Sequence, residues 1–144
     1  MSITTADLRR LLPHRYPFLL VDAVVACEPG VRLVARKVVT HDEPFFAGDL
    51  VRDPVMPDML VLESMAQAGG VLLMAEADDP TRKVVYFASL DAVQWHGDVR
   101  PGDELRLEVV VTKRRATLRK VRAEARVADM LVCEGELAAV LADR

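Results

Sequence analysis

The hydrophobic positions in the first third of the chain predict one short helix followed by two strands. Thr4 can cap a helix whose leucines fall on one face, and Pro13 ends that helix. The stretches 18–28 and 31–40 are rich in Val and Leu, and a Pro-Gly turn signal separates them. We therefore expect the second stretch to return alongside the first as a neighbouring strand.

The next hydrophobic stretch, residues 57–77, predicts a helix with apolar residues on nearly every side. Pro57 suits the first helical position, and Asp58 suits the positive end of the helix dipole. A helix that is apolar nearly all round is typical of a buried element rather than of an amphipathic surface helix. The sequence therefore predicts one long central helix that other elements cover.

Beyond this helix, an alternation of apolar and polar positions predicts antiparallel strands with one dry and one wet face. Between Lys120 and Val127, Val and Ala alternate with Lys, Arg and Glu. Such a sheet can bury its apolar face on the helix. The predicted fold is α+β, a curved antiparallel sheet wrapped around one central helix, and its open edges favour pairing into a dimer. The expected strands are 84–90, 104–114, 117–128 and 130–141.

Length and composition narrow the class of protein. The 144 residues fit a single domain, residues 1–144. Hydrophobic residues make up 51% of the chain but aromatic residues only 5%, so Val, Leu, Ala and Met must build the core. A net charge of −3 without a dominant basic block argues against nucleic-acid binding. The short basic clusters 113–115 and 119–120 are typical of hairpin ends; alternatively, they form a basic rim for an acidic partner protein.

The cysteines and histidines show no metal-binding spacing. Cys27 and Cys133 lie far apart in apolar runs and the three histidines are scattered, so we expect two buried thiols, no metal and no cofactor. The N-terminus lacks the pattern of a signal peptide. The most apolar stretch, 59–75, contains Glu63 and Gln67 and is short for a membrane span. We therefore expect a cytoplasmic protein without a membrane span.

Two polar side chains interrupt the predicted central helix. Glu63 and Gln67 are one turn apart on the same face, so they can form a narrow stripe that faces solvent. Alternatively, Glu63 is a carboxylic acid in a cleft that donates a proton or holds water, because a carboxylate buried without a partner is costly. Two adjacent glycines, 69 and 70, lower the helix propensity by about 1 kcal/mol each. They fit either the close approach of a ligand or tight packing against the sheet.

The loop before the helix is a second candidate site. Residues 42–57 contain three prolines and a glycine, so we expect no regular structure there, and long loops are often functional. The loop leads to a helix N-terminus, whose free N–H groups can bind a carbonyl oxygen or an anion. Its charged residues Asp49, Arg52 and Asp53 can alternatively form a solvated loop with an Arg–Asp pair.

Four motifs follow one another along the chain in a familiar order. They are Leu12-Pro13-His14-Arg15-Tyr16-Pro17-Phe18, Glu43-Pro44-Phe45-Phe46, Pro54-Val55-Met56-Pro57 and Leu62-Glu63-Ser64-Met65-Ala66-Gln67. A later Pro101-Gly102-Asp103 precedes a predicted strand. In this order the motifs resemble the 3-hydroxyacyl-[acyl-carrier-protein] dehydratases, the hot-dog-fold enzymes of fatty-acid elongation. The resemblance covers residues 11–141, nearly the whole chain.

The resemblance implies a hydro-lyase that converts 3-hydroxyacyl thioesters into trans-2-enoyl thioesters and water. In that family a loop histidine removes the proton next to the thioester carbonyl, and a carboxylate on the central helix helps the hydroxyl to leave. Backbone N–H groups at the start of the helix polarise the thioester. The histidine of one subunit works with the carboxylate of the other. The implied partners are therefore an acyl carrier protein bearing the acyl thioester and a second hot-dog subunit.

Residue by residue, only part of that site carries over. Glu63 matches the helix carboxylate, and Gln67 matches the neighbouring glutamine. Asp49 stands in the place of the family's histidine, and Asp58 in the place of a glycine at the start of the helix. Because aspartate has a pKa of about 3.9, it is a far weaker base than imidazole. The resemblance assigns substrate contacts to Gln67 and to Phe46, Gly48, Met56, Pro57 and Asp58.

Three functional hypotheses remain. We favour a pseudo-subunit of a dehydratase, with an impaired site that a histidine-retaining partner completes in a heterodimer. A homodimer that is active through a coupled Asp49 and Glu63 pair is the first alternative. The second is an acyl thioesterase on the same fold, which rests on fold-level analogy. His41 and His96 fall where the family has no catalytic histidine, and we expect both at the surface.

Overall fold

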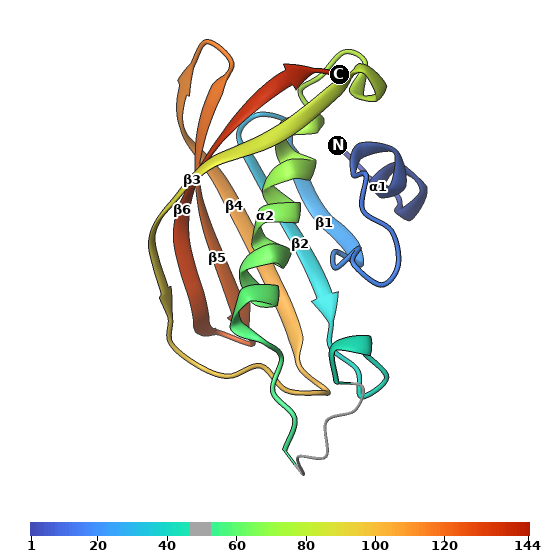
Figure 1. Cartoon of the computed structure of the whole chain (residues 1–144), viewed down its shortest axis with the longest axis vertical. Coiled ribbons are helices and arrows are strands. Elements are labelled where there is room, and N and C mark those ends of the chain that lie inside the picture. Colours follow the sequence, from blue (N-terminus) through green and yellow to red (C-terminus); the bar gives the residue numbers. More distant parts are fainter. Residues whose placement is uncertain (47–52) are drawn as a thin grey trace.

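Six antiparallel strands form one curved sheet that wraps around a long helix (Figure 1). The structure is a computed structural model that describes residues 1–46 and 53–144. Neighbouring strands follow the order β1-β2-β4-β5-β6-β3. The strands are β1 (Ala23–Glu28), β2 (Arg32–Val38), β3 (Lys83–Trp95), β4 (Glu104–Arg115), β5 (Leu118–Val127) and β6 (Met130–Asp143).

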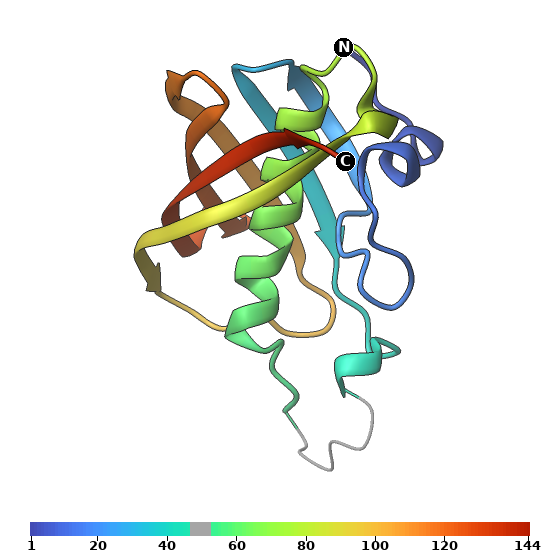
Figure 2. The same cartoon turned by 45° about the horizontal axis from the view of Figure 1, so that its top comes forward.

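The central helix α2 (Asp58–Met74) confirms the predicted buried helix. Nearly all of its residues from Val61 onward are buried, and the sheet surrounds it in both views (Figures 1 and 2). Pro57 has an extended backbone and precedes the first helical residue, and the helix ends three residues before the predicted Ala77. The apolar core of Leu, Val, Ala and Met side chains lies between α2 and the inner face of the sheet.

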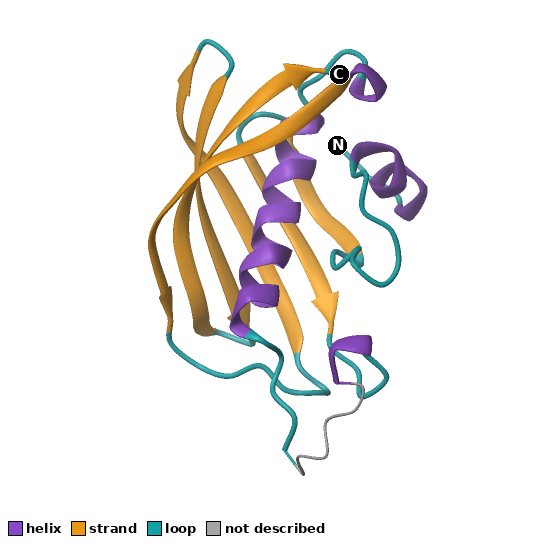
Figure 3. Ribbon diagram, viewed as in Figure 1, coloured by secondary structure: helices purple, strands orange, loops and turns teal. Residues whose placement is uncertain are grey.

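Local sequence signals set the short helices. Thr4 caps α1 (Thr5–Leu11): its hydroxyl accepts a hydrogen bond from the Asp7 N–H, and the Asp7 carboxylate accepts one from the Thr4 N–H. Two single 3-10 turns, η1 (Pro44–Phe46) and η2 (Pro80–Arg82), interrupt the loops on either side of α2 (Figure 3). The first of these lies inside the loop that we predicted to lack regular structure.

The strand prediction for residues 18–28 is wrong in its first five residues, because β1 begins at Ala23. The N–H groups of Phe18 and Leu19 donate to the Arg15 carbonyl in a turn, at 2.7 Å and 3.1 Å. The Leu20 N–H donates to the side chain of Gln67 rather than to a strand. The backbone of residues 18–20 is therefore hydrogen-bonded to a side chain of α2, and bonding to β2 begins only with the Asp22 N–H, which donates to the Arg36 carbonyl at 3.0 Å.

The alternation in β5 is confirmed, since Val121, Ala123 and Ala125 are fully buried. The strand β3 is longer than predicted and runs to Trp95 at the edge of the sheet. The basic cluster at the β4–β5 hairpin lies partly against the end of α2. There Glu76 pairs with Arg114 at 3.0 Å and with Arg119 at 3.4 Å.

Both cysteines are buried and unbonded to each other, as predicted. Burial raises the pKa of the Cys133 thiol to about 11, with a further contribution from the negative charge of Asp58. Cys133 is therefore a neutral thiol at physiological pH. Within the described ranges, no helix is long and apolar enough to cross a membrane.

Candidate active site

Gln67 joins the N-terminal segment to the central helix. Its side-chain NH2 group donates to the Phe18 carbonyl oxygen at 2.7 Å, and its Oε1 accepts from the Leu20 N–H at 2.8 Å. Only 2% of Gln67 is exposed, so it does not form the solvent-facing stripe that was one reading of the sequence. Because its amide is occupied by bonds within the chain, Gln67 is suited to hold the walls of a site in place.

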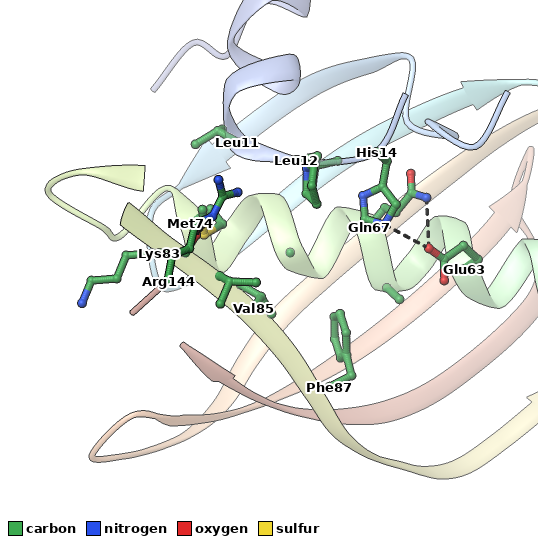
Figure 4. A pocket seen from close by; sticks show the side chains of 14 residues that line it. Leu11, Leu12, His14, Glu63, Gln67, Met74, Lys83, Val85, Phe87 and Arg144 are labelled. Carbon is green, nitrogen blue, oxygen red and sulfur yellow. Dashed lines mark hydrogen bonds and ion pairs between the residues drawn. The ribbon is translucent and has the colours of Figure 1, made fainter. Parts of the chain in front are cut away.

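Glu63 lies one turn before Gln67 and is half-buried. Its Oε1 accepts a hydrogen bond of 3.0 Å from the Gln67 NH2 group. The Nε2 atom of His14 lies 3.5 Å from the same oxygen, and each of these two side chains is 28% exposed (Figure 4). The motif around residue 14 and the central helix therefore meet at the Glu63 carboxylate.

An elongated cavity of about 270 Å³ runs along α2 from Glu63. Met74 lines its other end, three turns or roughly 16 Å further along the helix. The walls between them are mainly apolar and come from the segment after α1, from α2 and from β3 (Figure 4). Lys83 and Arg144 contribute the charged groups near Met74. A long, mainly apolar space with a carboxylate at one end fits an acyl chain whose reactive end is polar.

Glu63 also borders a second, more open hollow of about 450 Å³. This hollow lies between the first turns of α2 and residues 87–90 of β3, and Met59 and Leu62 form part of its wall. The carboxylate can therefore be approached from two sides, along the cavity or across the edge of the sheet.

The other residues that the resemblance assigned to the substrate lie away from these two spaces. Met56 is 1% exposed and its N–H donates to the Val99 carbonyl at 2.8 Å. Phe46 is buried against Phe45, with ring centroids 4.6 Å apart. Pro57 and Asp58 are exposed at the start of α2, where the Asp58 carbonyl accepts a hydrogen bond from Trp95 Nε1. Gly48 and Asp49 lie outside the described residues.

The remaining charged and histidine candidates take surface positions. Asp53 pairs with Arg100 at 2.9 Å, while its predicted partner Arg52 lies outside the described residues. His41 is exposed, as expected, and His96 pairs with Glu134 at 3.0 Å on the surface. In residues 1–46 and 53–144, no group of three His, Cys, Asp or Glu side chains comes together as a metal site.

His14 is the functional candidate that the sequence reasoning missed. We used it only as part of a motif, although imidazole is the side chain best suited to proton exchange near neutral pH. Its position inside the first family motif, residues 12–18, was the signal that could have identified it as a functional candidate. Its proximity to Glu63 depends on a contact across 49 positions of the chain, which no local pattern encodes.

Replacing Gln67 by Leu should lower the free energy of unfolding by about 2–6 kcal/mol, because two backbone groups, one buried and one part-buried, lose their partners at about 1–3 kcal/mol each. Urea unfolding measures this change. Gln94→Leu is the matched control, since Gln94 is exposed on β3. A loss for Gln67→Leu no larger than that of the control would contradict the role given to these hydrogen bonds.

The sheet wrapped around one buried helix, with a carboxylate of that helix on an apolar cavity, defines a protein of the hot-dog fold. The model of the FabA-like domain matches residues 12–136. The chain therefore belongs to the FabA-like family.

Curated relatives share more than two fifths of the sequence. A 3-hydroxyacyl-[acyl-carrier-protein] dehydratase FabZ of Chloroflexus aggregans is 44% identical over 141 residues, which are 98% of this chain and 97% of the relative. The FabZ of Geobacter metallireducens is 45% identical over 139 residues, 96% and 93% of the two chains. These matches support the dehydratase family predicted from the motifs.

A solved structure confirms the fold. The dehydratase heterocomplex ApeI:P of Xenorhabdus doucetiae superposes with a TM-score of 0.76 at 20% identity, and the match covers 95% of this chain and 91% of that one. The likeness shows the same α+β hot-dog architecture that the sequence predicted.

Proposed function

We propose that the chain is a subunit of a 3-hydroxyacyl-[acyl-carrier-protein] dehydratase of fatty-acid or polyketide-type biosynthesis in the cytoplasm. Its substrate is a 3-hydroxyacyl thioester on an acyl carrier protein, and the product is the trans-2-enoyl thioester and water. The observation that carries this proposal is the Glu63 carboxylate at one end of an elongated apolar cavity. The names of the relatives supply the substrate class.

Glu63 takes the role of the group that protonates or holds the departing hydroxyl. It lies about one and a half turns from the start of α2, where backbone N–H groups are free to polarise the thioester carbonyl. Asp58 adds a negative charge near that carbonyl, while its own N–H is still available. The negative charge of Asp58 therefore weakens the polarisation of the thioester carbonyl by these N–H groups but does not abolish it.

The general base, which removes the proton next to the thioester carbonyl, is the group that this chain lacks in its usual form. Asp49 stands where the family has histidine, and a positioned general base contributes about 10²- to 10⁴-fold to the rate. The chain alone is therefore a slow catalyst, and a hot-dog subunit that retains the histidine completes the site across a heterodimer. The dehydratase heterocomplex of Xenorhabdus doucetiae is a precedent for such an assembly.

The free edge of β3 is the surface on which the second subunit packs. From Tyr86 to Leu90 every residue of β3 is exposed, so neither face of the strand is buried there, whereas alternate residues are buried along much of β5 and β6. Tyr86 is 62% and Leu90 48% exposed, and neighbouring Met59 on α2 is 62% exposed. An edge strand with exposed apolar side chains on both faces favours pairing with another chain.

Replacing Tyr86 and Leu90 together by Arg should therefore convert a dimer into a monomer, since two charges are placed on the interface of each subunit. Light scattering during size-exclusion chromatography measures the mass. The double variant Arg106→Ala, Arg122→Ala on the outer face of the sheet serves as the control and should stay dimeric. A Tyr86 and Leu90 double variant that still pairs with itself or with a histidine-retaining subunit contradicts this interface.

The proposed function is tested by giving the purified chain 3-hydroxyacyl and trans-2-enoyl thioesters of an acyl carrier protein and following their interconversion. We expect slow interconversion that rises on addition of a histidine-retaining hot-dog partner. A different result is that the chain alone reaches a rate that neither a partner nor a histidine at position 49 increases. That result would support catalysis by the Asp49 and Glu63 pair of a homodimer. Release of free thiol would indicate a thioesterase, and no reaction in any combination would overturn the proposal.

Gly70 should set how long an acyl chain the cavity accepts. A Cβ atom at this position would lie 3.3 Å from Leu12 Cδ2 in the wall of the cavity, so Gly70→Ala narrows the space. Gly69→Ala is the matched control, because Gly69 does not line the cavity and a Cβ there meets only ordinary contacts of 3.8 Å and 3.9 Å with side chains of the sheet. Competition between acyl thioesters of different length should show a shift toward shorter chains for Gly70→Ala alone. The same preference in both variants would contradict this assignment.

A further inference from the structure

We propose that His14 is a positioning residue of the dehydratase site, and that its neutral imidazole donates its Nε2–H toward Glu63 Oε1. Together with Gln67 it occupies one carboxylate oxygen and leaves the other, Oε2, to face the 3-hydroxyl group of the substrate. This inference rests on the proposed function and adds a residue to its site.

The chain on both sides of His14 is fixed in place. The Arg15 guanidinium donates to three carbonyl oxygens, those of Leu12 at 2.9 Å, His14 at 2.7 Å and Arg9 at 2.8 Å. On the other side, Gln67 holds the Phe18 carbonyl at 2.7 Å. The backbone that carries the imidazole is therefore tied both to α1 and to α2.

Two donors converge on the same oxygen of Glu63. The Gln67 NH2 group lies 3.0 Å from Oε1, and the Nε2 atom of His14 lies 3.5 Å from it (Figure 4). Catalytic hydrogen bonds are often long before substrate binds and shorten in the complex. No hydrogen bond to Oε2 occurs among the described residues, and Glu63 lines the cavity. Oε2, which no described residue occupies, is thus the oxygen available to a ligand.

The other nitrogen of the ring identifies the tautomer. His14 Nδ1 is buried and has no hydrogen-bond partner within residues 1–46 and 53–144. In neutral imidazole one nitrogen carries the proton and the other a lone pair. An N–H donor buried without an acceptor is costly, so the lone pair belongs on Nδ1 and the proton on Nε2. This tautomer directs the only N–H of the ring toward Glu63.

The titratable and charged groups around the pair are few. Lys83 and Arg144 line the same cavity near Met74, roughly 16 Å along the helix from Glu63. Neither forms an ion pair with Glu63 within the described part of the chain. Among residues 1–46 and 53–144, His14 is therefore the group besides Gln67 that is placed to change the orientation of this carboxylate.

Two substitutions of His14 separate a donor role from a purely structural one. Gln can place its side-chain nitrogen near the position of Nε2, whereas Asn places it near Nδ1. We expect His14→Asn to lower kcat by about 10- to 100-fold with little change in KM, the effect of one hydrogen bond to a charged group. We expect His14→Gln to stay within a few-fold of the parent, and His96→Asn on the surface to be unchanged. Equal effects of the Asn and Gln variants would overturn the inference.

The effects of the His14 substitutions on kcat and KM are measured both in the wild-type chain and in the Asp49→His chain. The second chain is expected to turn over faster, so the effects can be measured even if the wild-type chain is slow. If neither chain converts a carrier-protein thioester, the proposed function fails, and the tautomer of His14 decides the inference separately. In ¹⁵N-labelled protein the ring nitrogens should show the proton on Nε2, and Glu63→Gln should weaken that preference. A proton found on Nδ1 would overturn the role assigned to His14 even in an active enzyme.

Discussion

The Asp49→His variant should dehydrate 3-hydroxyacyl thioesters about 10²- to 10⁴-fold faster than the wild-type chain. The reason is that a positioned general base contributes a factor of this size, and imidazole accepts a proton near neutral pH far better than an aspartate carboxylate does. The prediction rests on our proposal, made from the order of the sequence motifs, that Asp49 stands in the place of the family's histidine. The rate is measured with the purified variant and acyl carrier protein substrates in both directions.

A histidine elsewhere in the same loop should not raise the dehydration rate. Asp53→His is the matched control, because Asp53 is an exposed carboxylate of the same loop that pairs with Arg100. We expect this control to stay at the wild-type rate. If the wild-type chain already reaches the rate of Asp49→His, the chain is not a pseudo-subunit and its own carboxylates carry the full reaction.

Replacing Glu63 by Gln in the Asp49→His chain should remove most of that gained activity, again by about 10²- to 10⁴-fold. The substitution keeps the size of the side chain, and its amide oxygen can still accept the hydrogen bond from Gln67. What is lost is the group that can protonate the departing hydroxyl. The turnover of the double variant gives the size of the loss.

The stability of the protein separates this chemical effect from damage to the fold. Urea unfolding should give nearly the same free energy with Glu63 or Gln at this position, since the hydrogen bond to Gln67 is kept. Glu104→Gln on the exposed face of β4 is the matched control and should leave the rate unchanged. An active Glu63→Gln enzyme would rule out this carboxylate as the acid.

The elements that the sequence predicted well are those set by local patterns. The capping residues Thr4 and Asp7 define the start of α1 within four positions of the chain. The alternation from Lys120 to Val127 identifies β5 and its buried face. The apolar stretch of α2 has no polar face wide enough for solvent, so its burial followed directly from the sequence.

The parts that could not be predicted depend on contacts between distant residues. Residues 18–20 have the composition of a strand, but Gln67 supplies hydrogen bonds that a neighbouring strand would give. The same contacts bring His14 next to Glu63, although nothing near residue 14 encodes that meeting. Glu63 itself was found because a carboxylate in an apolar helix violates the local pattern, which is typical of functional positions.

An acyl thioester should bind along α2 with its 3-hydroxyl group at Glu63. A crystal structure of the chain with a 3-hydroxyacyl pantetheine in which an amide replaces the thioester tests this most directly. We expect the acyl chain in the cavity between Glu63 and Met74, with the hydroxyl within hydrogen-bond distance of the Glu63 carboxylate. A ligand bound elsewhere, or one whose hydroxyl points away from Glu63, would contradict it.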